Sequence, residues 1–211
     1  PLTVIRGAAH NLLSGIVADE KRRRSYLEAI AAQSAQLADM VEQLLAYAKT
    51  RNEAPVEIEP VEVSGAVSEA IESLHYELQR SGATLDLDIP ADLPAVWVEA
   101  AGLRRALVNL IGNAAKHGGR QIVVAAREIP AGVEIRVSDD GEGIAPEEAA
   151  RIFEAFYRGE RARASKIRGT GLGLNLVRQV VEAAGGSVAL ESKPGQGASF
   201  VIRLRTEAPT R

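Results

Sequence analysis

Residues 139–144 read DDGEGI, with two glycines spaced one residue apart behind a pair of aspartates. Just before them, Val133, Ile135 and Val137 alternate with polar residues, which predicts a half-buried strand that ends in this turn. Glycine lets the backbone come close to a ligand and leaves amide N–H groups exposed. The turn, headed by the carboxylate of Asp139, is therefore a candidate ligand contact.

A second glycine turn, GTGLG at residues 169–173, opens an apolar segment that predicts a helix over 172–184. The partial positive charge at a helix N-terminus suits a phosphate group. Between the two turns, residues 151–159 read RIFEAFYRG, and cations recur at Arg158, Arg161, Arg163, Lys166 and Arg168. We interpret this segment as a mobile cationic lid over a polyphosphate, with its start anchored to the domain by Phe153 and Phe156.

Upstream of both turns, residues 109–117 read NLIGNAAKH. Asn109, Asn113, Lys116 and His117 recur at helical spacing and share one face. Two asparagines at this spacing are by themselves typical of a solvated face.

Together these blocks resemble the N, G1, F and G2 boxes of the sensor histidine kinases, in order and spacing, and the resemblance covers nearly the whole chain. It implies a site for ATP and Mg²⁺. The matching Asp, here Asp139, accepts a hydrogen bond from the adenine amine, whereas guanine has a carbonyl at that position. Asn113 matches the Mg²⁺ ligand of the family, and its amide oxygen is the hard donor that Mg²⁺ takes.

The resemblance also assigns the remaining site residues. Nucleotide contacts are expected from Asn109, Asn113, Lys116, His117, Asp139, Gly141, Gly143, Ile144, Phe156, Gly169, Thr170, Gly171, Leu172 and Gly173. Catalytic roles are expected for Asn109, Lys116 and Arg158, while His117 can equally be a helix C-terminal cap. Residues 195–200 depart from the family pattern, because Ala198 lacks the usual hydroxyl, which puts one polar contact near the base in doubt.

Asn109 separates two uses of the same nucleotide fold. The related gyrase, chaperone and mismatch-repair ATPases carry a Glu at this position, one helical turn before the Mg²⁺-binding Asn, where it activates water. An amide has no useful basicity, so it cannot act as a general base. This favours transfer of phosphate to a histidine over an ATP-hydrolysing clamp. A non-catalytic ATP-binding dimerisation module that signals by conformation remains the alternative.

Composition sets wider bounds. The chain has 211 residues, 46% apolar and 25% charged, with a formal net charge of −3, as expected for a soluble protein of one or two domains. This charge argues against a nucleic-acid partner, and the KRRR run at 21–24 reads as a solvated helix start. Cysteine is absent, which excludes disulfides and thiolate sites. No apolar run approaches the roughly 20 residues that span a bilayer, and no secretory signal is visible.

The first fifty residues carry apolar groups at alternating steps of three and four, which predicts two helices joined by a turn at 15–20. The first helix, over 2–16, has its seam at Leu2, Ile5, Ala9, Leu12 and Ile16. The second, over 19–50, has its seam at Tyr26, Ile30, Gln33, Leu37, Met40, Leu44 and Tyr47. We expect an antiparallel hairpin that pairs with a second copy as a four-helix bundle; the alternative is a hairpin packed on its own globular domain.

The predicted organisation is a hairpin at 1–51, a linker at 52–56 and an ATP-binding domain at 57–206. Strands are predicted at 61–63, 84–89, 96–98, 121–129, 132–139, 187–192 and 199–205, and helices at 100–117 and from an N-cap at Ser64 to about 81. The mixed order predicts an α+β chain whose second part is an α/β sandwich of the Bergerat (GHKL) type, with helices on one face of a mixed sheet.

The resemblance further implies what lies outside this chain. The family's phosphoacceptor block ends as residues 1–3, PLT, do, so the acceptor histidine is expected before Pro1. His10 and His75 lack its sequence context. Expected partners are a second copy through the hairpin and the receiver domain of a response regulator. The chain is expected to be a fragment, the cytoplasmic portion of a membrane-bound sensor, attached to a membrane only through segments absent from it.

Overall fold

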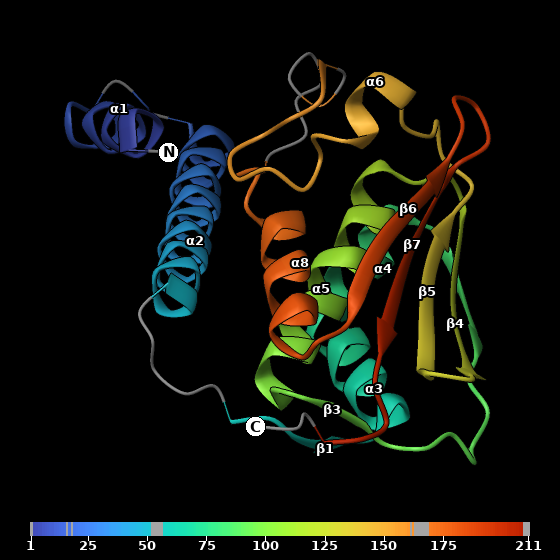
Figure 1. Cartoon of the computed structure of the whole chain (residues 1–211). Helices are drawn as coiled ribbons and strands as arrows, with labels where there is room; N and C mark the ends of the chain where they lie inside the picture. The colour runs from blue at the N-terminus through green and yellow to red at the C-terminus, as the bar shows by residue number, and fades with distance from the viewer. Residues whose placement is uncertain are drawn as a thin grey trace. The chain divides into compact units, whose positions relative to one another are not determined.

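The computed structural model describes residues 2–15, 17, 19–51, 57–160, 162 and 169–208, with the side chains at 35, 36, 39, 40 and 42–51 excepted. The chain divides into two compact units, Pro1–Asn52 and Glu53–Arg211 (Figure 1). The predicted linker at 52–56 lies outside the described residues.

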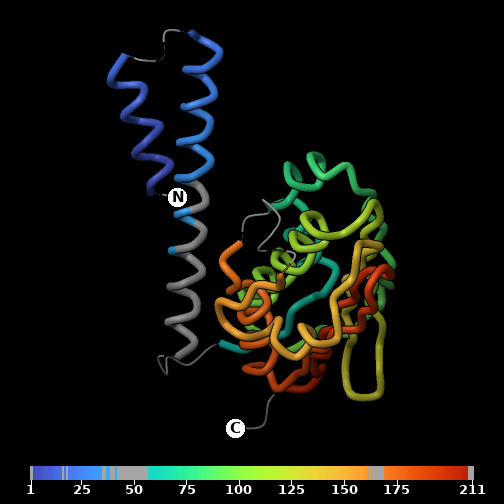
Figure 2. The backbone as a smooth tube through the Cα atoms, turned by 90° about the horizontal axis from the view of Figure 1, so that it is seen from above, coloured from blue at the N-terminus to red at the C-terminus, as the bar shows by residue number. Residues whose placement is uncertain are grey.

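The first unit is a hairpin of α1 (Leu2–Leu13) and α2 (Glu20–Arg51), which lie side by side in Figure 2. A turn with Gly15 at φ +69° follows α1. Asp19 caps α2, because its carboxylate accepts hydrogen bonds from the backbone N–H groups of Lys21 and Arg22 at 3.3 and 3.2 Å. The predicted start at 19 is thus the cap, and the helix begins one residue later.

The seam between the two helices follows the predicted spacing where it is described. Gln33 is buried, and the other covered positions are half-buried: Ile5, Ala9, Leu12, Tyr26, Ile30 and Leu37. Ala8, not predicted, is the most buried residue of α1, whereas Leu2 is 66% exposed. The predicted seam residue Ile16, and the side chains of Met40, Leu44 and Tyr47, lie outside the described part. Large apolar side chains remain exposed at Leu2, Val4, Leu13, Leu27 and Val41.

The second unit is built on a five-stranded sheet of order β2-β4-β5-β7-β6. Its strands are β2 (Thr84–Asp88), β4 (Gln121–Ile129), β5 (Gly132–Asp139), β6 (Ser187–Ser192) and β7 (Ala198–Leu204). β2 pairs parallel with β4, and the other pairings are antiparallel, so the sheet is mixed, as predicted. A separate antiparallel pair joins β1 (Glu59–Val61) to β3 (Val96–Val98).

Helices cover one face of this sheet (Figure 1). They are α3 (Val63–Ser73), α4 (His75–Ser81), α5 (Ala100–His117) and α8 (Gly173–Ala183), with a short α6 (Pro146–Ala149) in the connection after β5. Apolar residues of α5 and α8 are fully buried together with residues of the sheet: Leu103, Leu107, Ile111, Val177, Val181, Ile135 and Ile202. The predicted α/β sandwich is confirmed.

The start of this unit differs from the prediction. The first strand is Glu59–Val61 rather than 61–63, and Ser64 is not an N-cap, since the helix already begins at Val63 and its N-cap is Glu62 without a side-chain bond. Val63 is only 2% exposed, so burial of this side chain, rather than capping chemistry, sets where the helix starts. The predicted single helix to 81 is interrupted at Leu74, between α3 and α4.

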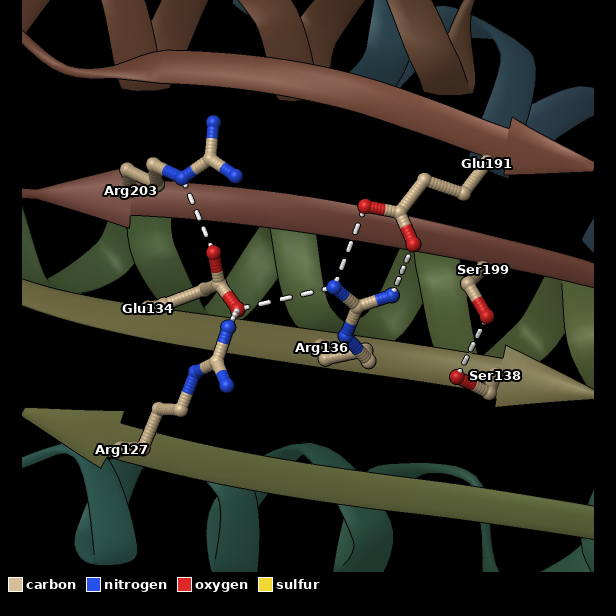
Figure 3. A network of polar contacts seen from close by, with 7 residues as sticks. All are labelled: Arg127, Glu134, Arg136, Ser138, Glu191, Ser199 and Arg203. Atoms are coloured by element: carbon tan, nitrogen blue, oxygen red, sulfur yellow. Dashed lines mark hydrogen bonds and ion pairs between the residues drawn. The ribbon is translucent and has the colours of Figure 1, made fainter. Parts of the chain in front are cut away.

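β5 is buried more deeply than its alternation predicts. On the face away from the helices, Glu134 is only 3% exposed, because three guanidinium groups surround its carboxylate (Figure 3). Arg127, Arg203 and Arg136 lie 2.6, 2.9 and 3.6 Å from it. Desolvation raises the pKa of Glu134, but hydrogen bonds from Arg203 and Arg127 outweigh it and lower the pKa overall. Ion pairs with the three arginines therefore shield the carboxylate of Glu134 from water.

Candidate functional site

Close contacts at two glycines bring the three motif-bearing segments together. A Cβ added at Gly141 would lie 2.8 Å from both Asp139 Oδ1 and the carbonyl oxygen of His117, at the end of α5. A Cβ at Gly173, the first residue of α8, would lie 2.4 Å from Asn109 Oδ1. Only glycine allows these approaches, so the turn after β5 and the start of α8 both meet α5.

The first glycine turn is held by backbone N–H groups that donate to its two aspartates, from within the turn and from β4 and β7. Asp139 is half-buried, and its Oδ1 accepts a hydrogen bond from Gly141 N at 2.9 Å. Burial raises the pKa of Asp139, against the opposing backbone N–H groups of Gly141 and Ala198. Asp140 instead accepts from Gln121 N at 2.8 Å, which makes it the turn-forming residue of the pair. Asp139, which is half-buried and accepts a hydrogen bond within the turn, therefore stays the candidate for a ligand contact.

The far side of this turn is fixed to the β6–β7 connection. Gly143 has φ +70°, and an added Cβ would lie 2.1 Å from the carbonyl oxygen of Lys193. The N–H of Ile144 donates to Ser192 Oγ at 2.8 Å, and that hydroxyl donates to the carbonyl of Gly197 at 2.7 Å. Ser192 was not predicted from the sequence, yet it links the two loops that border the site.

α5 presents four polar side chains over its last two to three turns. Asn109 is half-buried, and its Nδ2 donates to the carbonyl of Arg105 at 2.8 Å, which orients its Oδ1 toward α8. Asn113 is half-buried, whereas Lys116 and His117 are largely exposed. The pKa of His117 is lowered, first by partial burial of its ring and then by the charges of Lys116 and Arg158.

The effect on His117 shows that Arg158 lies near the end of α5 and that cations gather there. Arg158 is half-buried and donates to the carbonyl of Ala162. The other lid cations, Arg161, Arg163, Lys166 and Arg168, lie outside the described residues. Within the described part of the chain, no three His, Cys, Asp or Glu side chains are grouped to hold a metal ion. A cation here would thus rely on amide oxygens such as that of Asn113 and on the ligand's own oxygens.

Of the two aromatic residues predicted to anchor the lid, only one does. The ring of Phe153 packs edge-on against Phe200, with centroids 6.3 Å apart. The prediction was wrong for Phe156, whose side chain is 60% exposed and whose backbone adopts a left-handed φ of +65°. Its backbone N–H donates to the carbonyl of Gly171 at 2.9 Å. The backbone of Phe156 therefore makes the attachment that its ring does not.

The second glycine turn leads into α8 without a side-chain cap. Gly169 is exposed, and Thr170 Oγ1 accepts from Leu172 N at 3.2 Å. Gly171 has φ +74°, and an added Cβ would lie 2.6 Å from the carbonyl oxygen of Tyr157. Leu172 is the buried N-cap residue and makes no side-chain cap hydrogen bond. N–H groups of the first turn of α8 thus have no side-chain cap, as an anion site requires.

Asn175, in that first turn, was also missed by the sequence analysis. It is 5% exposed, and its Nδ2 donates to the carbonyl of Phe153 at 2.9 Å. The only sequence signal is a polar residue inside an apolar helical run, which by itself does not show what the side chain contacts.

Comparisons with known proteins agree with this arrangement. Residues 98–208 match the family model for histidine kinase-, DNA gyrase B- and HSP90-like ATPases, and residues 1–53 match the His Kinase A (phospho-acceptor) domain. The sensor-like histidine kinase SenX3 of Mycobacterium tuberculosis is 33% identical over 189 residues, which cover 88% of this chain and 46% of SenX3. CpxA of Escherichia coli, a sensor histidine kinase, is 30% identical over 87% of this chain and 41% of its own length.

Solved structures show the same fold. The Acinetobacter baumannii histidine kinase AdeS superposes with a TM-score of 0.76 at 20% identity, over 98% of this chain and 95% of AdeS. Full-length ShkA, solved in complex with AMPPNP, has a TM-score of 0.74 at 27% identity, over 98% of this chain and 44% of ShkA.

The fold and the paired matches define a GHKL-type ATP-binding domain joined to a phosphoacceptor-type helical hairpin. The chain belongs to the sensor histidine kinase family. It spans about half the length of the curated relatives it matches. None of the helices in the described part is both long and apolar enough to cross a bilayer.

Proposed function

We propose that the chain binds ATP with Mg²⁺ and transfers the γ-phosphate to a histidine on the dimerisation hairpin of the whole protein, which passes it to an aspartate of a response regulator. The observation that carries this proposal is the meeting of α5, the turn after β5 and the start of α8 in one place. The complex of ShkA with AMPPNP, an ATP analogue, supports nucleotide binding by this fold.

The base end of the site is the turn after β5. Asp139 keeps one carboxylate oxygen on Gly141 N, while a carboxylate has capacity for several further hydrogen bonds. An exocyclic amine of adenine can donate to it, and the guanine carbonyl cannot. Gly141 and Gly143 have no side chains, so the backbone of this turn can pack closely on His117 and Lys193, which holds Asp139 in place.

The phosphate end lies toward the last turn of α5 and the first turn of α8. Lys116, Arg158 and the uncapped start of α8 supply positive charge for the phosphates. The amide oxygen of Asn113 suits Mg²⁺, which when bound would neutralise phosphate charge and orient the γ-phosphate. Partial burial of the ring, and then the charges of Lys116 and Arg158, lower the pKa of His117, which favours its neutral form.

The presence of an asparagine at position 109 favours a histidine, rather than water, as the acceptor of the phosphate. The side chain lies beside α8 where a general base would activate water, but an amide cannot take a proton at neutral pH. A neutral imidazole needs no such base, since its ring nitrogen is itself a nucleophile for the γ-phosphorus as the bond to ADP breaks. Transfer to histidine is therefore favoured over hydrolysis.

The hairpin supplies the proposed dimer. A single hairpin leaves large apolar side chains exposed on α1 and α2, and pairing with a second copy would bury them in a four-helix bundle. In this proposal the receiver domain of a response regulator docks on the same bundle. We place the chain in the cytoplasm, where ATP is available, with membrane attachment through other segments of the whole protein.

Nucleotide titration tests the first half of this function. In calorimetry with Mg²⁺, the whole chain should bind ATP and should bind GTP at least about tenfold more weakly, because GTP leaves the carboxylate of Asp139 facing an acceptor. Equal affinities for the two nucleotides would overturn the assignment of the base site.

A further inference from the structure

Asn175 is a polar side chain buried in the first turn of α8, on the face that otherwise buries Leu176, Val177, Val180 and Val181. It is 5% exposed, and its neighbours Leu176 and Val177 are buried with it. Burying a carboxamide is unfavourable unless it is hydrogen-bonded. Its Nδ2 donates to the carbonyl of Phe153 at 2.9 Å, while its Oδ1 has no donor among the residues that the structure describes. Because an apolar side chain could fill this position, the bond to Phe153 is the best reason for an amide there.

A second hydrogen bond joins the same two segments. The N–H of Phe156 donates to the carbonyl of Gly171 at 2.9 Å. Both bonds join the segment before Arg158, where the lid begins, to the segment after the lid. Phe153 and Phe156 lie on the first segment, and Gly171 and Asn175 lie on the second. We call this pair of hydrogen bonds, Asn175 to Phe153 and Phe156 to Gly171, the lid clasp.

The lid clasp holds the short backbone segment that leads to Arg158. Phe156 has a left-handed backbone with φ +65°, which residues other than glycine rarely adopt, and its exposed ring offers little packing to hold it there. Arg158 follows two residues later and lies close enough to His117 to act on it electrostatically. Loosening the clasp would therefore leave the position of Arg158 relative to the end of α5 less well fixed.

We propose that Asn175 is a positioning residue of the nucleotide site: through the Phe153 carbonyl it fixes the base of the lid on α8 and so sets where Arg158 meets the phosphates. This inference rests on the proposed ATP-binding function. Asn175 itself is not required to touch the nucleotide.

The test compares two substitutions in the whole chain. Asn175→Leu removes the amide and keeps the same branched skeleton of four side-chain heavy atoms, whereas Val177→Ala truncates a fully buried neighbour on the same helix and leaves the clasp intact. Calorimetry with ATP and with AMP, which lacks the β- and γ-phosphates, separates the lid from the base site. Asn175→Leu should lower ATP affinity about fivefold and leave AMP affinity unchanged, as expected for one lost hydrogen bond. Val177→Ala should lower the melting temperature but keep the ratio of the two affinities.

Amide hydrogen exchange without nucleotide gives an independent readout. Exchange at the Phe156 N–H should be faster in Asn175→Leu than in the wild type and in Val177→Ala, when each is compared at the same margin below its melting temperature. This measurement needs no nucleotide, so it still tests the clasp if the chain fails to bind ATP. A failure to bind ATP would contradict the proposed function and not the clasp. If Asn175→Leu does not fold, Asn175→Ala replaces it, because a methyl group has no N–H to donate to Phe153.

A wild-type ratio of ATP to AMP affinity together with wild-type exchange at Phe156 would overturn the proposal. Equal losses of ATP and AMP affinity with unchanged exchange would also overturn it, because they would assign Asn175 to the stability of the fold alone.

Discussion

Replacement of Asp139 by Asn should weaken ATP binding without weakening the fold. The carboxylate is half-buried, and burial raises its pKa above the ordinary value of about 3.9. When folding raises the pKa of a carboxyl group, protonation of that group stabilises the folded state. This contribution is complete below the pKa of the unfolded chain and is lost as the pH rises through the pKa of the folded protein. At neutral pH the ionised Asp139 therefore opposes folding, and Asp139→Asn removes this unfavourable charge.

The two effects have different sizes. A hydrogen bond to a charged acceptor is worth about 1.5–3 kcal/mol, so losing the one to adenine should lower ATP affinity roughly 10- to 100-fold. The introduced amide keeps an oxygen for Gly141 N, which now lies at 2.9 Å from Asp139 Oδ1, but turns an NH₂ toward the base. Stability of the nucleotide-free protein at pH 7 should change by no more than about 1 kcal/mol, in either direction.

Asp140→Asn is the matched control. It makes the same chemical change one residue away, on an exposed carboxylate that accepts from Gln121 N at 2.8 Å. Calorimetry with ATP and Mg²⁺ should show a loss for Asp139→Asn and near wild-type affinity for Asp140→Asn. Thermal unfolding without nucleotide should show that Asp139→Asn remains folded. Wild-type affinity in Asp139→Asn, or equal losses in both variants, would refute the role of Asp139.

Two further substitutions probe the metal and the sheet. Asn113→Ala should lower ATP affinity about tenfold in Mg²⁺ and much less in EDTA, because its amide oxygen is the proposed ligand; equal losses in the two buffers would show a purely structural role. Glu134→Gln should destabilise the fold by about 1–3 kcal/mol at pH 7, since it leaves three arginines without their shared carboxylate, as followed by urea unfolding. Folding lowers the pKa of Glu134. The difference in unfolding free energy between the wild type and Glu134→Gln should therefore be present above the ordinary glutamate pKa of about 4.3. It should disappear as the pH falls through the lowered pKa of Glu134 in the folded protein. Glu191→Gln, which removes only the exposed pair with Arg136, is the control and should stay close to the wild type.

Local signals predicted much of the fold. The bounds of α5, β4, β5 and β6 agree with the prediction residue for residue, because glycines and polar turns mark where these elements end. Capping chemistry predicted less well at Ser64, because the helix begins at the buried Val63, two residues before the start that an N-cap at Ser64 would give. Tertiary packing outweighs a cap that is worth only about 1 kcal/mol.

At the candidate site, too, some residues could be predicted from the sequence and others could not. Spacing and residue type were enough to place Asn109, Asp139 and the glycine turns on segments that meet in the structure. The exposed ring of Phe156 and the buried amide of Asn175 could not be predicted, because each depends on a contact between segments on either side of the lid. Such contacts leave no periodic trace in the sequence.

The acceptor assignment also makes a prediction about the chain itself. His10 lies exposed on α1 in the sequence AAHNL, with no acidic residue directly after it. It lies nine residues after Pro1, and a helix rises about 1.5 Å per residue, so it is more than two turns beyond the position expected for the acceptor. The chain alone should therefore not phosphorylate itself.

The most direct test of the whole account is transfer of label from γ-labelled ATP. The chain is incubated alone and with a hairpin from the whole protein that carries the upstream histidine but cannot bind ATP. We expect acid-labile label on the added hairpin only, and none when Asp139→Asn replaces the wild type. No label on the hairpin despite ATP binding would favour a non-catalytic module, and steady phosphate release would favour an ATPase. Acid-labile label on the chain itself, lost in His10→Gln, would contradict the assigned acceptor.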